Sequence, residues 1–287
     1  MDFHKVTPAD GGWIRSALRG SGRFNCEESL VNLFTWGNLF GMEVAELGGC
    51  LICRFEGGYS LPIGQNREAV MDQALDLYGE GTFTLFGLEA QDFSFLERYC
   101  QHVRASYERQ WSDYIYSSEK LRLLTGKKLA AKRNHINAFE REHPDWHTAV
   151  ITKENMPAVY RFHDTWCAAR EIDQNLEEEL EAARLMLDNF FALGLEGLIL
   201  YAGDDIVAYA MGEPITDETY CVHVEKALSE VRGAYPLINR EFARTYCENY
   251  KYINREDDSG EMGLRKAKMS YEPIRIVHKY EAEMERK

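Results

Sequence analysis

The feature that most constrains this sequence is the alternation of short strand patterns with amphipathic helix patterns along its whole length. The clearest helix is expected at residues 175–193, where apolar side chains recur at spacings of three and four. The clearest hairpin joins residues 198–201 to 206–211. Both halves mix strands and helices in a similar order, although no repeat is visible residue by residue. The pattern predicts an α+β fold with a mixed sheet in each half.

The remaining elements follow from the same periodicity and from turn residues between the patterns. The segment 121–142 has no proline and is expected to form one basic helix that links the halves and is closed by Pro144. Further helices are expected at residues 29–40, 66–78, 92–100 and 234–249, and extended segments at residues 42–47, 50–55, 82–87, 102–116, 146–151, 219–224, 250–254 and 274–280.

Composition excludes several classes of protein. The 287 residues carry 33 basic and 47 acidic side chains, a formal net charge of −14, which argues against bulk electrostatic binding of nucleic acid or anionic membrane. No apolar run reaches the roughly 20 residues of a membrane-spanning helix, and the first residues do not read as a signal peptide. Seven scattered cysteines are typical of reduced, buried thiols, so a cytoplasmic protein is expected.

The final third contains a distinctive set of motifs, and a basic motif precedes it. Together they resemble a largely uncharacterised bacterial family related to the C-terminal domain of phosphatidylglycerol lysyltransferase. The resemblance covers nearly the whole chain. It is carried by residues 124–128, 132–135, 224–227, 233–235, 252–260, 263–268 and 270–273.

This resemblance implies two tandem GNAT-like acyltransferase domains, each a mixed, mainly antiparallel sheet flanked by helices. Residues 1–118 would form the first domain, residues 119–145 the basic linker helix, and residues 146–287 the second domain with the site. The arrangement is similar to that of Fem-type transferases, which take aminoacyl groups from tRNA. The lipid-modifying relatives carry a membrane-spanning half that is not seen here, and an apolar motif where this chain has the charged residues 254–258. The lipid substrate is therefore not carried over.

Two residues are candidates for the chemistry. Strand alternation would place Cys221, His223 and Glu225 on one face, with Glu225 at the strand end where GNAT folds often hold a general base. The alternative is an ion pair between Glu225 and a neighbouring Lys or Arg. Tyr271 follows a basic segment at a place where GNAT enzymes often hold a tyrosine that protonates the leaving thiolate. Its alternative role is to anchor the next strand.

A dense group of charges follows the strand at residues 250–254. One interpretation is contact with the substrate, and the alternative is a structural ion-pair network at a helix start. Consecutive carboxylates converge poorly on one ion, and the histidines show no metal-ligand spacing. Cys50 and Cys53 have C-x-x-C spacing, but on a strand they would face opposite ways and no second pair exists, so no metal is expected. The predicted substrate-binding residues are Lys226, Asn254, Arg255, Glu256, Asp257, Arg265 and Lys268.

Two segments are candidates for binding the donor. Arg232, Gly233 and Ala234 precede a helix, where a glycine turn could hold the pyrophosphate of coenzyme A, or could be a plain helix start. An aminoacyl-tRNA donor would not need that turn. The linker carries Lys128, Lys132 and Arg133 in a net positive stretch that could meet phosphates, or could be a solvated helix face.

The sequence therefore predicts an acyl- or aminoacyl-group transferase that uses aminoacyl-tRNA or acyl-CoA to modify an amine or hydroxyl acceptor, with no resident cofactor required. The alternative is a non-catalytic module that binds a ligand or nucleic acid on the same duplicated fold. If the enzyme interpretation is right, the candidate residues of the two segments should converge. The set expected to meet is Glu225, Asn254, Arg255, Glu256 and Arg265.

Overall fold

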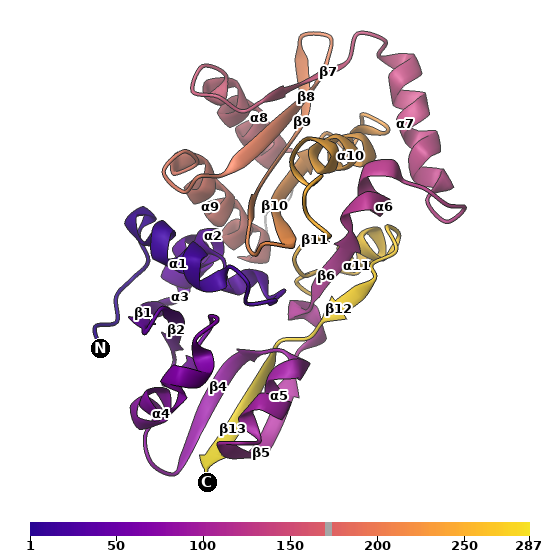
Figure 1. Ribbon diagram of the computed structural model, residues 1–287. Coiled ribbons are helices and arrows are strands. Elements are labelled where there is room, and N and C mark those ends of the chain that lie inside the picture. The colour runs from indigo at the N-terminus through magenta and orange to yellow at the C-terminus, as the bar shows by residue number, and fades with distance from the viewer. Residues whose placement is uncertain (170–173) are drawn as a thin grey trace.

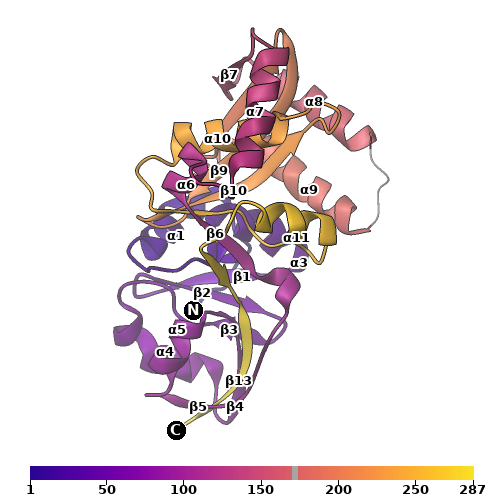
Figure 2. The same cartoon turned by 90° about the vertical axis from the view of Figure 1, so that its right-hand side faces the viewer.

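A computed structural model describes residues 1–169 and 174–287, with side chains placed for residues 1–169 and 177–287. The chain forms two sheets that follow each other along the long axis of the molecule, each with helices packed on it (Figures 1 and 2). None of the helices in these described ranges is both long enough and apolar enough to cross a membrane.

The first sheet lies in the lower part of Figure 1 and has the strand order β1-β2-β3-β4-β13-β5. Its strands pair antiparallel except for β3 and β4, which run parallel. The strands are β1 (Glu43–Leu47), β2 (Cys50–Phe55), β3 (Gly58–Ser60), β4 (Thr82–Leu88), β5 (Cys100–Tyr107) and β13 (Tyr280–Arg286).

The second sheet has the order β12-β6-β11-β10-β9-β8-β7, and β10 with β11 is its parallel pair. The other neighbours run antiparallel. The strands are β6 (Asp113–Ser117), β7 (His147–Val150), β8 (Glu196–Ala202), β9 (Asp205–Pro214), β10 (Thr219–Ala227), β11 (Tyr252–Asn254) and β12 (Arg275–Val277).

Each half supplies a strand to the sheet of the other half. Strand β6 precedes the linker but pairs with β11 and β12 in the second sheet. Strand β13 comes after the second sheet is complete and lies between β4 and β5 in the first (Figure 1). The division into residues 1–118, 119–145 and 146–287 stays a prediction. The exchange of β6 and β13 means that each outer range contributes a strand to the sheet of the other.

Helices cover both faces of the second sheet. Phe139 and Phe242, from α7 and α10, pack with Tyr220 of β10 in one apolar cluster, which also includes Leu121 of α6. Helices α8 and α9 pack on the opposite face in a cluster that continues into α1 and the first sheet. The helices are α1 (Gly11–Leu18), α2 (Leu30–Asn32), α3 (Asn38–Phe40), α4 (Arg67–Tyr78), α5 (Ala90–Leu96), α6 (Ser118–Leu123), α7 (Ala130–Glu142), α8 (Met156–Ala168), α9 (Gln174–Asp188), α10 (Ala234–Tyr246) and α11 (Met262–Met269).

The linker is two helices, α6 and α7, rather than the single helix expected for residues 121–142. Leu124 and Gly126 between them have φ angles of 49° and 91°, which an α-helix does not tolerate. The Arg133 guanidinium donates hydrogen bonds to the carbonyl oxygens of both residues, at 2.8 Å for Gly126, and so fixes the break.

The expected fold class is confirmed: the chain is α+β, with two mixed, mainly antiparallel sheets flanked by helices. Two expected extended segments are each divided between the sheets: residues 102–116 contain most of β5 and β6, and residues 274–280 contain β12 and the start of β13.

Candidate functional site

A β-bulge in β10 decides which side chains meet in the second sheet. The register of β10 against β9 shifts between Val222 and Val224. Val222 packs in the cluster beneath α10, whereas Val224 packs in the cluster on the opposite face. Because the bulge inserts one extra residue, Glu225 returns to the α10 face. The expectation that Cys221, His223 and Glu225 share one face is therefore wrong.

Glu225 forms an ion pair with Arg255, which directly follows β11, the parallel neighbour of β10. Nη2 of Arg255 lies 3.1 and 3.2 Å from the two carboxylate oxygens, and Nδ2 of Asn239 on α10 donates to Oε2 at 3.0 Å. The side chains of Arg255 and Glu225 are only 12% and 10% exposed. Nη1 of Arg255 is buried and has no hydrogen-bond partner within residues 1–169 and 174–287.

Two tyrosines and a lysine surround this pair. The Arg255 guanidinium lies 4.7 Å from the ring centre of Tyr271 and 5.6 Å from that of Tyr116. Nζ of Lys132 lies 4.0 Å from the centre of the Tyr271 ring. We call Tyr116, Lys132, Glu225, Asn239, Arg255 and Tyr271 the Glu225 cluster.

The charges of the Glu225 cluster do not balance. Two cations, Lys132 and Arg255, face one carboxylate. Burial lowers the pKa of Lys132, and the nearby Arg255 lowers it further. Burial also raises the pKa of the Tyr271 hydroxyl, which keeps it protonated at neutral pH. A partly buried site of this kind favours binding of an anion or of a group that becomes negative during a reaction.

Asn254, the last residue of β11, and Glu256 point away from the Glu225 cluster. Asn254 donates to the Phe24 carbonyl oxygen and to Asp113, at 2.7 and 2.8 Å. Glu256, whose φ is 57°, lies 2.8 Å from Nδ1 of His223. The side chains alternate in direction here, so Asn254 and Glu256 face the first half of the chain while Arg255 faces Glu225.

Asp257 and the basic residues of α11 form a separate network. Arg265 donates two hydrogen bonds to Asp258, at 2.7 and 2.8 Å, and Lys268 donates to the carbonyl oxygens of Arg255 and, at short range, of Asp257. The Asp257 carboxylate lies 3.8 Å from Nζ of Lys279. Arg265 and Lys268 thus hold the chain beside Arg255 in place rather than entering the cluster.

Lys226 lies on the face of β10 opposite to Glu225. Its ammonium group contacts Glu179 of α9 and lies 4.1 Å from the centre of the Trp166 ring. The structure therefore brings together Glu225, Arg255, Lys132 and Tyr271 of the expected site. It places Lys226, Asn254, Glu256, Asp257, Arg265 and Lys268 elsewhere.

Helix α7 covers the turn at residues 232–234, which was expected to bind the donor. Gly233 has a φ of 91°, and a Cβ atom there would lie 2.4 Å from the carbonyl oxygen of His135 on α7. Ala234 is buried beneath the same helix, and Arg232 donates a hydrogen bond to the His135 ring at 3.3 Å. The close packing of α7 thus explains why a glycine stands at position 233. Binding of a donor pyrophosphate at this turn stays a prediction.

The two other linker cations have partners within the protein. Lys128 forms an exposed ion pair with Glu272 at 2.7 Å, and Arg133 binds the carbonyl groups of the linker break. Contact of Lys128, Lys132 and Arg133 with tRNA phosphates stays a prediction.

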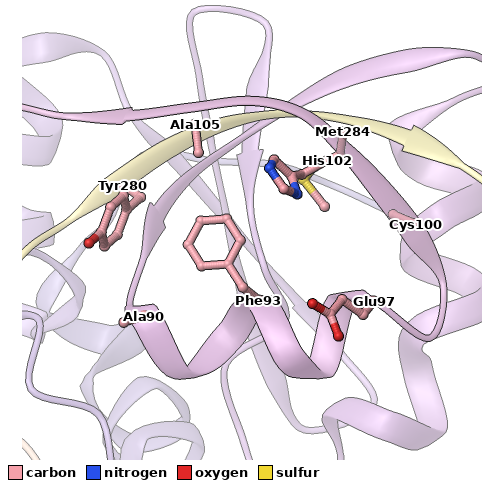
Figure 3. A pocket seen from close by; sticks show the side chains of 8 residues that line it. All are labelled: Ala90, Phe93, Glu97, Cys100, His102, Ala105, Tyr280 and Met284. Atoms are coloured by element: carbon pink, nitrogen blue, oxygen red, sulfur yellow. The ribbon is translucent and has the colours of Figure 1, made fainter.

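A cavity of about 310 Å³ lies in the first half, away from the Glu225 cluster. Phe93 of α5 projects into it, beneath the side chains of His102, Tyr280 and Met284 from β5 and β13 (Figure 3). None of the residues that line it belongs to the expected site. Its lining is mostly apolar and therefore offers less chemistry than the Glu225 cluster.

Sequence reasoning missed two members of the Glu225 cluster. Asn239 lies on α10 between apolar residues that point to the core, and it is only 3% exposed. A buried amide in such a stripe needs a polar partner, which was a usable signal. Tyr116 gave no such signal, because it joins the cluster only through the placement of β6 in the second sheet.

Comparison with known proteins agrees with this architecture. A family model described as phosphatidylglycerol lysyltransferase, C-terminal, matches residues 19–283. A conserved protein of unknown function from Bacteroides thetaiotaomicron has 36% sequence identity and a TM-score of 0.89, covering 99% of this chain and 100% of that one.

Two more distant relatives extend the comparison. The C-terminal domain of a putative lysylphosphatidylglycerol synthetase from Agrobacterium fabrum has 14% identity and a TM-score of 0.63, with 96% and 92% coverage, so it shares the fold. An uncharacterised protein of Mycoplasmoides gallisepticum, MYCGA3080, is 25% identical over 170 residues. That match covers 59% of this chain and 55% of the relative, so the chain matches only about half the length of that curated protein.

The two sheets and this shared fold confirm the expected α+β architecture with two mixed sheets, and its likeness to tandem GNAT domains stays a prediction. With a family model that spans residues 19–283, the chain belongs to the family of the phosphatidylglycerol lysyltransferase C-terminal domain.

Proposed function

We propose that this protein transfers an acyl or aminoacyl group to an amine or hydroxyl acceptor at the Glu225 cluster. One observation carries the proposal: a carboxylate and an excess of positive charge meet at the bulged strand, and one guanidinium nitrogen there, Nη1 of Arg255, has no hydrogen-bond partner in the described structure. Membership in a family named for an aminoacyl transfer reaction supports the reaction class.

In the proposed reaction, the carboxylate acts as the base and the two cations stabilise the negative charge that then forms. The acceptor attacks the carbonyl carbon of the donor ester or thioester, and Glu225 accepts the proton that the acceptor releases. The carbonyl oxygen becomes an oxyanion, which Arg255 and Lys132 stabilise. The carbonyl then re-forms as the bond to the donor oxygen or sulfur breaks, and the leaving alcohol or thiol takes the proton that Glu225 accepted, so the products are an amide or ester and the free donor.

The hydrogen bonds already made by Glu225 define what this mechanism requires. Its carboxylate accepts from Arg255 and Asn239 in the structure. An acceptor must therefore approach an oxygen that Arg255 releases as it turns toward the donor. We propose aminoacyl-tRNA or acyl-CoA as the donor, with Lys132 directed to its reacting group.

The test follows consumption of the donor. Wild-type protein is incubated separately with a pool of aminoacyl-tRNAs and with acyl-CoA, each with a mixture of amines and hydroxyl compounds, and loss of the ester or thioester is measured. Glu225→Gln should keep the fold, because the two side chains are nearly isosteric, and should lower the rate by about 10²–10⁴-fold. Glu196→Gln, at a carboxylate of β8 that accepts from Tyr220 at 2.9 Å, is the matched control and should keep the rate.

Two outcomes would contradict the proposal. A folded Glu225→Gln protein that consumes donor at the wild-type rate would remove Glu225 from the chemistry. Wild-type protein that retains a donor without consuming it would instead favour the alternative, a binding module on the same fold. Thermal unfolding of each variant on the same preparation separates loss of activity from loss of structure.

A further inference from the structure

A second cluster lies on the opposite face of β10 from Glu225, where the two halves of the molecule meet. Cys221 and His223 come from β10, and Glu256 comes from the turn after β11. Their ligand atoms all lie within 4.8 Å of one another. We propose that Cys221, His223 and Glu256 bind one divalent transition-metal ion, zinc by preference.

The distances fit a single ion. Sγ of Cys221 lies 3.7 Å from Nδ1 of His223 and 3.9 Å from Oε1 of Glu256, and the latter two atoms are 2.8 Å apart. Zinc binds sulfur at about 2.3 Å and nitrogen or oxygen at about 2.0–2.2 Å, so tetrahedral ligands lie roughly 3–4 Å from one another. Only the His223–Glu256 separation must widen slightly to reach this geometry.

The groups behind the cluster resemble those that support metal-bound histidines. Nε2 of His223 faces Oε1 of Glu213 at 3.5 Å, a distance too long for a hydrogen bond as it stands. Glu213 is buried and is held by Arg15 at 3.1 Å and by the backbone N–H of Val31 at 2.9 Å. A carboxylate on the far nitrogen of an imidazole orients the ring and makes the near nitrogen a better ligand.

Glu256 is also held in a position that the backbone does not favour. Its φ of 57° is uncommon for a residue with a side chain, and such strain is concentrated at functional sites. Nδ2 of Asn32 donates to its Oε1 at 2.9 Å, while the buried Oδ1 of Asn32 has no hydrogen-bond partner within the described ranges. Asn32 thus links the cluster to α2 in the first half.

The donor set indicates which ion would bind. One sulfur, one imidazole nitrogen and one carboxylate oxygen suit zinc or a neighbouring transition metal rather than Mg²⁺ or Ca²⁺. A bound cation deprotonates a coordinating thiol, so Cys221 would bind the ion as a thiolate. Three protein ligands leave a fourth position for water or a small ligand.

Metal titration of the full chain tests this site. After chelator treatment and buffer exchange, the protein is titrated with Zn²⁺ by calorimetry and with Co²⁺ by absorbance. We expect one ion per chain, a sulfur-to-cobalt charge-transfer band and a higher melting temperature with metal. Cys221→Ser should abolish the band, and Glu213→Gln should weaken Zn²⁺ binding by about 10–100-fold.

The chain offers a matched control. Sγ of Cys167 on α8 lies 3.5 Å from Nε2 of His163, so Cys167→Ser removes another cysteine–histidine contact away from the cluster. This variant should keep both the band and the affinity. Wild-type protein without the charge-transfer band would overturn the proposal, and this outcome depends on no variant being folded. Equal Zn²⁺ affinity in wild type and folded Cys221→Ser would overturn it as well.

Discussion

At the scale of single residues, a dense group of buried charges surrounds Arg23 in the first half. Its guanidinium lies 2.6 Å from carboxylate oxygens of both Glu28 and Asp92, and 3.9 Å from Glu89. Arg67 also pairs with Asp92 at 3.0 Å. Three nearly buried carboxylates thus share two guanidinium groups, which leaves an excess of negative charge away from water.

This excess predicts a specific pH dependence of stability. Burial raises the pKa of Glu28 to about 7, although Arg23 opposes the shift. The folded state therefore binds the Glu28 proton more tightly than the unfolded state, whose pKa is about 4.3. The free energy of unfolding should fall as pH rises from about 4.3 to 7, by roughly 3 kcal/mol from this residue.

Urea unfolding between pH 4 and pH 8 measures this effect. Glu28→Gln removes the titrating group and should flatten the decrease. Glu68→Gln, at an exposed carboxylate paired with Arg98, should keep the wild-type slope. If Glu28→Gln and wild type show the same slope, the decrease has another origin.

Individual site residues were predictable where the signal was local. The sequence offered pairing with a nearby arginine as the alternative role of Glu225, and the structure supplies Arg255 as that partner, although Glu225 lies inside β10 rather than at its end. The bulge at His223 could not be read from the sequence, because it depends on how β10 pairs with β9. The Cys221, His223 and Glu256 cluster was missed for the same reason, since its third member comes from another strand end.

At the scale of elements, the packing of α7 on α10 depends on one glycine. A Cβ on Gly233 would lie 2.4 Å from the carbonyl oxygen of His135 and 2.9 Å from Cβ of Phe139, so α7 would have to move. This contact matters for function because α7 also carries Lys132 to the Glu225 cluster.

Gly233→Ala should destabilise the protein by more than the cost of its backbone conformation. A left-handed alanine costs about 1–2 kcal/mol, and the clash with α7 adds to this. Gly126 has the same φ of 91°, but a Cβ atom added there would meet no other atom of the described residues within 4 Å, so Gly126→Ala isolates the backbone cost. Equal losses of unfolding free energy in the two variants would show that α7 moves away from the new Cβ without a measurable cost.

Helices and strands were predicted well where the local periodicity of the sequence determines them, and poorly where the pairing of distant strands determines them. The strand at Cys50–Phe55 and the start of the helix at Ala234 match the sequence expectation closely. The segment 274–280 reads as one strand, yet it divides between two sheets around His278 and Lys279. No local signal marks that division, because both pieces are extended and differ only in their distant partners.

At the scale of the whole molecule, β13 is the strand that completes the first sheet. Strand β13 lies between β4 and β5 and is hydrogen-bonded to both. Among the described residues, β5 has no other neighbouring strand in that sheet. Ala282 and Met284 of β13 are each 1% exposed and belong to the apolar core of the first half. The end of the chain thus returns from the second sheet to stabilise the first.

Removal of residues 280–287 should therefore unfold part of the opposite end of the sequence. Hydrogen exchange should become fast in β4 and β5, which lose their shared neighbour, while β8 and β9 keep their protection. Arg286→Ala is the control, because it removes only an exposed ion pair with Asp76 and should leave the exchange unchanged. Full protection of β5 in the shortened chain would contradict this dependence.

The position of β13 also sets an order of events during synthesis on the ribosome. Strands β4 and β5 emerge early, but the strand that joins them is translated only after β6 to β12. At about 5–20 residues per second, the two edges stay unpaired for on the order of ten seconds or more. Strands β8 to β10 are consecutive antiparallel neighbours, so that part of the second sheet can pair first. The half translated first thus becomes the half folded last, and its open edges are what a nascent-chain chaperone would have to cover.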